Sequence, residues 1–118
     1  MPNRTFSTRR GDEVHTWAVP ALWEASEGLT VFEYDVSRFD ALDLDVWFCG
    51  VNEPTIRAVL DHHRRIRDAD WRFPIILSAK GEVMDGVHRI CRALTEHRLT
   101  IPAVQFVSDP PPTARTPA

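Results

Sequence analysis

Residues 83–90 read VMDGVHRI, a pattern that predicts a short strand, a turn at Gly86 and the first turn of a helix. A helix N-terminus presents free backbone N–H groups and the positive end of a dipole, so this turn suits an anion. Arg89 can bind phosphate through two hydrogen bonds, and His88 can donate to an oxyanion or carry a proton near neutral pH. Asp85 can hold Mg²⁺ or accept a proton from a hydroxyl, and Gly86 lets the backbone approach a ligand closely.

A second interpretation of this turn needs no ligand. Asp85 would then cap the helix, and His88 and Arg89 would be solvated. Cationic side chains in a first turn oppose the helix dipole, which a bound anion would explain. The spacing alone leaves both interpretations open.

The second half of the chain has the clearer periodicity. It predicts a helix from Pro54, a strand at 73–78 that forms a hairpin with 83–85, a helix from Val87 through His97 and a strand at 101–107. Apolar residues at helical spacing mark the helix that follows Pro54, namely Ile56, Val59, Leu60 and Ile66.

The first half is less regular. We expect a short helix at 17–25, with Pro20 in its first turn and Gly28 as its end, and a strand at 29–36. The following segment is ambiguous, although Val46–Phe48 is a short apolar stretch whose Trp47 and Phe48 are candidate pocket walls. Together these elements predict an α+β fold, in which a small mixed β-sheet packs with helices.

Length and composition describe a single small domain. The 118 residues divide into a flexible N-terminal arm at 1–13, a folded domain at 14–107 and a Pro-rich disordered tail at 108–118. The net charge of -3 argues against a nucleic-acid binder, and the basic run at 62–65 is expected to be a solvated helix face. No apolar run is long enough to cross a membrane, and two cysteines form no disulfide framework, so a cytoplasmic location is predicted.

The pattern P-I-I-L-x-x-x-G-x-V-M-D-G-x-H-R-I-x-R-A-L at 74–94, followed by I-P-A-V-x-F at 101–106, resembles the ParB N-terminal/sulfiredoxin-like superfamily. The resemblance implies a nucleotide-binding fold whose phosphates, usually with Mg²⁺, lie on a Gly-x-His-Arg turn. It assigns this role to Gly86, Val87, His88 and Arg89, with Asp85 as the metal ligand.

Three branches of that superfamily differ at the turn. Sulfiredoxins carry a catalytic cysteine where this chain has Val87, and Cys91 is expected to face the core instead. Chromosome-partitioning ParB proteins carry Gly-Glu-Arg-Arg and bind CTP. Free-serine kinases share the Asp-Gly-x-His-Arg form, but they need a catalytic carboxylate from the N-terminal half. Glu53 is the candidate for that carboxylate, with Glu33 behind it.

Two functions follow from this resemblance. One is a phosphotransferase that acts on an unidentified small molecule, with Asp85, His88 and Glu53 as catalytic residues. We expect its nucleotide to be ATP or ADP rather than CTP. The other is a non-catalytic module that senses a nucleotide and engages a protein or DNA partner. A homodimer is compatible with both. A nuclease is the weakest hypothesis, because the sequence offers no cluster of metal-binding carboxylates.

Overall fold

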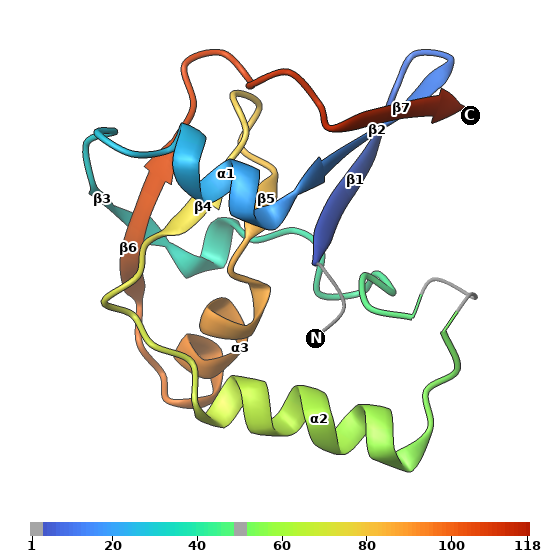
Figure 1. The fold of residues 1–118 in the computed structure, drawn as a ribbon. Helices are drawn as coiled ribbons and strands as arrows, with labels where there is room; N and C mark the ends of the chain where they lie inside the picture. Colours follow the sequence, from blue (N-terminus) through green and yellow to red (C-terminus); the bar gives the residue numbers. More distant parts are fainter. Residues whose placement is uncertain (1–3, 49–51) are drawn as a thin grey trace.

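The computed structural model describes residues 4–48 and 52–118 (Figure 1), so Cys49 lies outside the described residues. The elements, in chain order, are β1 (Thr5–Arg10), β2 (Glu13–Ala18), α1 (Val19–Ala25), β3 (Phe32–Asp35), the 3₁₀ turn η1 (Val36–Arg38), α2 (Ile56–Arg67), β4 (Ile75–Leu77), β5 (Val83–Asp85), α3 (Val87–Thr95), β6 (Thr100–Gln105) and β7 (Ala114–Pro117). They form a small α+β domain, as the sequence predicted.

A four-stranded sheet with the order β3-β6-β4-β5 organises the molecule. β4 pairs with β5 in the predicted antiparallel hairpin, and α3 returns the chain so that β6 runs parallel to β4. β3 completes the sheet antiparallel to β6. The carboxyl end of β5 and the start of α3 therefore meet at one edge of the sheet, where the sequence placed its candidate site.

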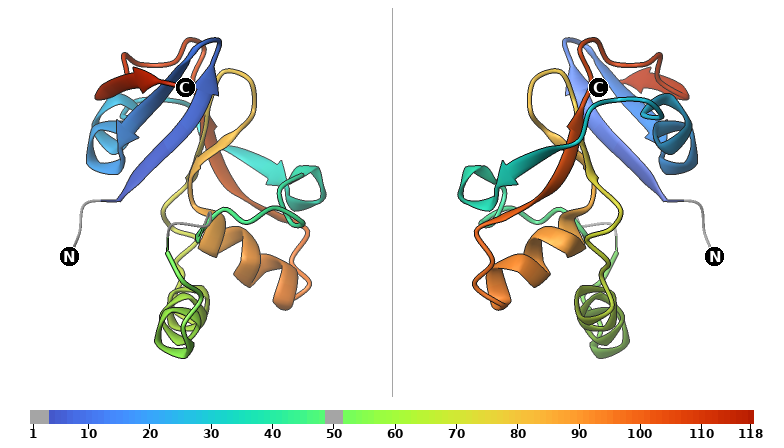
Figure 2. Two further views of the ribbon diagram at one scale, coloured as in Figure 1. Left: turned by 90° about the vertical axis from the view of Figure 1, so that its right-hand side faces the viewer. Right: turned by 90° about the vertical axis from the view of Figure 1, so that its left-hand side faces the viewer.

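Both faces of this sheet are covered, which explains why β4 is apolar at every position. Ile75 and Leu77 point to the face beneath α3, where they pack with Ile90 and Ile101. Ile76 points to the other face, which α1 and β2 cover with Leu22 and Trp17. Figure 2 shows α1 and the smaller sheet on one side of the molecule and both α2 and α3 on the other.

The smaller sheet has the order β1-β2-β7 and corrects two sequence predictions. Residues 5–10, expected in a flexible arm, pair with β2, and residues 114–117, expected in a disordered tail, pair with its other edge. Contacts from distant residues hold both segments. Arg10 forms an ion pair of 2.6 Å with Glu82, and Trp17 donates a hydrogen bond of 2.8 Å from Nε1 to the carbonyl of Pro110.

Most element boundaries shift by a few residues from their predicted positions. The helix expected at 17–25 begins at Val19, because Trp17 and Ala18 extend β2, and the strand expected at 29–36 is limited to Phe32–Asp35. Val46–Phe48 forms no strand, and α3 ends at Thr95, two residues before His97. The helix after Pro54 begins at Ile56, with the Thr55 hydroxyl accepting a hydrogen bond of 3.1 Å from the Ala58 N–H.

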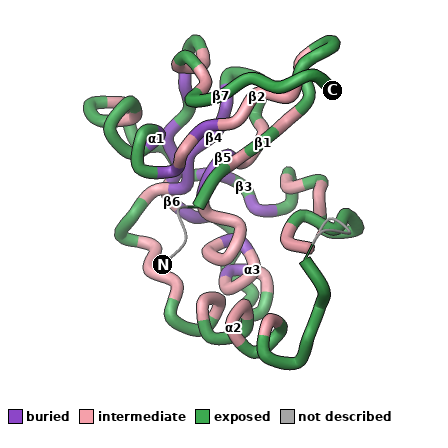
Figure 3. The backbone as a smooth tube through the Cα atoms, turned by 45° about the vertical axis from the view of Figure 1, so that its right-hand side comes forward, coloured by how far each residue is buried: buried purple, intermediate pink, exposed green. Residues whose placement is uncertain are grey.

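α2 lies at the end of the molecule and packs mainly on α3. None of its residues is buried, and the tube in Figure 3 passes through α2 only in the intermediate and exposed colours. Across the described residues, no helix is long and apolar enough to span a bilayer.

Candidate functional site

The strand, turn and helix at 83–95 form as predicted, and they fix the position of every residue in the candidate site. Gly86 is the residue before α3 and has φ of 116°, a conformation that favours glycine. A Cβ at this position would lie 2.4 Å from Cγ2 of Ile75. The glycine is therefore required by its backbone conformation and by close packing on β4, whereas the sequence suggested close approach to a ligand.

Asp85 is 7% exposed and is held by two side chains. Its Oδ2 accepts hydrogen bonds from Nε1 of Trp23 at 2.9 Å and from Nη2 of Arg89 at 3.0 Å. Gly86, rather than Asp85, occupies the capping position of α3, and no side-chain cap bond forms there. The capping interpretation is therefore wrong, and Asp85 is a partly desolvated carboxylate at the edge of the sheet.

Arg89 is tied to the protein through the same contact. Its Nη1 also donates to the carbonyl oxygens of Phe73, at 2.8 Å, and Pro74, at 3.3 Å. Burial lowers the pKa of Arg89, and the neighbouring Asp85 opposes that shift. The guanidinium thus joins the start of β4 to the end of β5, and three of its five N–H groups already have acceptors.

His88 forms a hydrogen-bonded pair with His62 of α2. Nε2 of His88 lies 2.8 Å from Nδ1 of His62, and the two rings are nearly parallel, at 13°. Trp47 stacks over both rings, with centroid distances of 4.2 Å to His62 and 5.0 Å to His88. Phe48 meets His62 edge-on at 5.5 Å. Trp47 and Phe48, predicted as pocket walls, instead cover this histidine pair.

Burial of the pair disfavours positive charge on both rings. Desolvation lowers the pKa of His88 to about 4, and His62, Arg65 and Arg4 add electrostatic repulsion. The pKa of His62 is lowered as well, first by burial and then by Arg65. Both rings are therefore neutral at pH 7, and a single N–H lies between them. His88 does not supply the positive charge near neutral pH that the sequence suggested.

A cavity of about 890 Å³ opens beside this turn. Its walls differ in character. Apolar side chains of several elements form one part, namely Trp23, Leu29, Val31, Phe73, Ile76 and Val104. Charged and polar groups form the other, namely Arg4, Arg65, Asp85, His88 and Arg89, together with Ser26, Glu27, Asp68 and Asp70. The guanidinium of Arg4 lies 5.7 Å from the Trp23 ring centroid, where the two parts meet.

The structure does not bring every predicted residue to this cavity. Glu53 is exposed before α2 and does not line it, and neither does the exposed Glu33 of β3. Sequence reasoning missed Arg4 and Trp23, because each reaches the turn through long-range packing. Cys91, expected to face the core, is only half-buried, and desolvation raises the pKa of its thiol.

A resident Mg²⁺ at Asp85 does not fit these contacts. Within the described ranges, no group of three or more His, Cys, Asp or Glu side chains is placed to hold a metal ion. Oδ2 of Asp85 is already neutralised by the guanidinium of Arg89, whereas Mg²⁺ requires several oxygen ligands in a near-octahedral arrangement.

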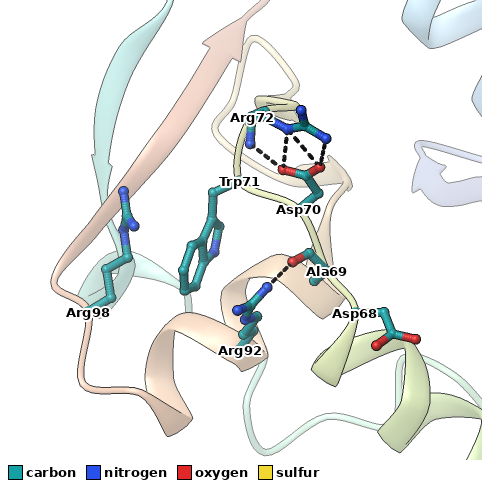
Figure 4. Close-up of a pocket in the computed structure, with 7 residues that line it drawn as sticks. All are labelled: Asp68, Ala69, Asp70, Trp71, Arg72, Arg92 and Arg98. Carbon is teal, nitrogen blue, oxygen red and sulfur yellow. Dashed lines mark hydrogen bonds and ion pairs between the residues drawn. The ribbon is translucent and has the colours of Figure 1, made fainter.

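A second cavity, of about 460 Å³, is lined by residues 68–72, Arg92 of α3 and Arg98 (Figure 4). Trp71 stands in it between two guanidinium groups, with Cζ of Arg92 at 4.5 Å and Cζ of Arg98 at 4.4 Å from its ring centroid. Arg92 donates to the carbonyl of Ala69, and Asp70 is bonded by Arg72. The charged side chains that line this cavity are largely engaged by other groups of the protein. We therefore interpret the cavity as a part of the packing and not as a binding site.

Comparisons of the chain with family models, with curated proteins and with solved structures found no match. The similarity to the ParB N-terminal/sulfiredoxin-like superfamily therefore stays a prediction that residues 74–106 carry.

Proposed function

We propose that this protein binds a nucleotide in the 890 Å³ cavity, with the phosphates at the start of α3 and the base against the apolar wall. The observation that carries the proposal is that one cavity combines apolar side chains with three arginines at the start of α3, although acidic side chains line it as well. A volume of this size falls in the range of small-molecule sites, which usually combine apolar walls with a few polar groups.

Two arginines and the backbone support the placement of the phosphates. Arg4 and Arg65 line the cavity near the turn, and neither is used in the Asp85–Arg89 contact. The N–H groups of Arg89 and Ile90 bond to the carbonyl of Gly86, so the two preceding N–H groups, of Val87 and His88, are those that a helix start leaves for an anion. His88 remains neutral, so it can serve as a hydrogen-bonding wall.

Trp23 supports the placement of the base. Its indole is about half exposed, at 49%, although Nε1 is fixed on Asp85. A ring that is held at one edge and half exposed suits stacking with a planar base on the face that Arg4 does not cover. Leu29 and Val31 extend this apolar surface along the segment before β3.

We favour binding and sensing over phosphoryl transfer. A phosphotransferase needs a carboxylate free to accept the proton of the acceptor hydroxyl. Oδ2 of Asp85 is engaged by Trp23 and Arg89, and Glu53 lies away from the cavity lining. A kinase would therefore have to use a carboxylate that is already paired with Arg89, whereas nucleotide binding uses the arrangement as it stands.

The test is a calorimetric titration of the protein with ATP, ADP, CTP, GTP and inorganic phosphate, each with and without Mg²⁺. We expect one nucleotide to bind more tightly than phosphate, and Arg65→Gln and Arg4→Gln each to weaken it about tenfold, or about 1.4 kcal/mol. Arg115→Gln, on the exposed β7, is the matched control and should bind like the wild type. Absence of binding by every nucleotide, or equal affinity in all three variants, would contradict the proposal.

A further inference from the structure

The outer face of α2 is apolar and open to solvent. Ile56, Val59 and Leu60 are 81%, 50% and 55% exposed. An amphipathic helix normally buries its apolar stripe, but α2 turns His62 and Ile66 toward the protein and leaves this stripe uncovered. Exposed apolar surface of this kind marks an interaction site.

A second exposed apolar segment lies between η1 and α2. Residues 40–46 read DALDLDV, and Leu42, Leu44 and Val46 are 61%, 66% and 42% exposed. We call residues 40–46 the acidic loop, because each apolar residue in this segment is next to an aspartate in the sequence. Ten of the acidic residues of the chain precede residue 54, against four basic ones.

The charges on α2 have the opposite sign. Four arginines lie on this helix, at 57, 64, 65 and 67, against one acid, Asp61. Arg64 and Arg67 are each 64% exposed. The helix therefore offers an apolar stripe with basic borders, and the acidic loop offers apolar side chains with acidic neighbours. The two surfaces are complementary in both respects.

The acidic loop is anchored away from most of this stripe in its own molecule. Its carboxyl end is held by Trp47, which stacks on His62. His62 and Leu60 are two residues apart on α2, so their side chains point about 200° apart around the helix axis. The end of the loop is thus anchored on the side of α2 that is turned away from Leu60 and Ile56, although only about 60° from Val59, so a second molecule can reach the outer part of the stripe.

We propose that two copies of this chain form a two-fold dimer, in which the acidic loop of each copy docks on the apolar stripe of α2 of the other. The contact is isologous, so each loop–helix contact occurs twice. Both segments are exposed in the monomer, and the association therefore requires no unfolding.

Sedimentation velocity over a series of protein concentrations tests this proposal. We expect a concentration-dependent dimer that dissociates more readily at about 500 mM than at about 50 mM NaCl, because salt screens the ionic contacts. Ile56→Ser/Leu60→Ser should give a monomer. The matched control is Leu99→Ser/Val107→Ser, which changes residues that are 78% and 94% exposed outside the proposed contact and should leave the dimer intact.

Charge reversal tests the choice of partner surface. Asp40→Arg/Asp43→Arg and Arg57→Asp/Arg64→Asp should each weaken the dimer at least tenfold, and a chain carrying all four changes should recover it. A wild-type protein that stays monomeric throughout the series would overturn the proposal. A dimer that persists in Ile56→Ser/Leu60→Ser would overturn it as well, and so would loss of the dimer in both this variant and the Leu99→Ser/Val107→Ser control. Failure of the chain with all four charge changes to dimerise would also overturn it. Circular dichroism of each variant confirms that it is folded.

Discussion

The histidine pair under Trp47 predicts how stability depends on pH. His88 has a pKa of about 4 in the folded protein, against an ordinary value of 6.5. Above pH 6.5 the ring is neutral in both the folded and the unfolded state, so it has no effect on the pH dependence. As pH falls below 6.5, the His88 ring becomes protonated in the unfolded chain but stays neutral in the folded protein. The free energy of unfolding therefore decreases.

The size of this decrease follows from the two pKa values. A difference between 6.5 and about 4 corresponds to about 3 kcal/mol, fully lost only below pH 4. At pH 5 the loss relative to pH 7 is about 2 kcal/mol by the same linkage. His88 is only partly buried, and solvent screening reduces the expected loss to about 1–2 kcal/mol.

Urea unfolding at pH 7 and pH 5 measures this loss. His88→Gln keeps a hydrogen-bonding group beside His62 but cannot titrate, so its stability should fall less between the two pH values, by about 1–2 kcal/mol. His63→Gln changes an exposed histidine of α2, next to His62, and should follow the wild type. Equal losses in the wild type and His88→Gln, or a titration of the His88 ring near 6.5 by NMR, would refute the reasoning.

Three further predictions concern the packing around the site. Gly86→Ala should cost about 3 kcal/mol of unfolding free energy through its steric clash and positive φ, whereas Gly81→Ala, with φ of 92° and open space, should cost about 1 kcal/mol. Arg89→Met should cost about 3 kcal/mol because it leaves a buried carboxylate unpaired, and Asp85→Asn in the same chain should recover part of that loss. Trp17→Phe should cost about 2 kcal/mol through a lost hydrogen bond and a small cavity. Urea unfolding at neutral pH measures all three, and losses of equal size at both glycines would contradict the first.

The elements of the second half were predictable because their patterns are local. The apolar run of β4, the glycine after β5 and the helical spacing of α3 each specify their structure within a few residues. β1 was not predictable in this way, because TFSTRR contains one large apolar residue and resembles a polar arm. Its position depends on pairing with β2 and on the contact between Arg10 and Glu82, 72 residues apart.

The candidate site shows the same division. Sequence spacing correctly placed Asp85, His88 and Arg89 together at the end of β5. It could not assign their partners, because Trp23 and His62 come from α1 and α2. Those partners change the chemistry, since Arg89 becomes a cross-link between strands and His88 becomes a neutral ring.

The alternation of β4 between two cores has a consequence for cooperativity. Three consecutive residues, Ile75, Ile76 and Leu77, supply both hydrophobic clusters, so neither cluster can loosen while the other keeps its strand in place. Heat should therefore melt the α1 side and the α3 side in one calorimetric transition, with the calorimetric enthalpy equal to the van't Hoff enthalpy. The central strand makes the two layers a single folding unit.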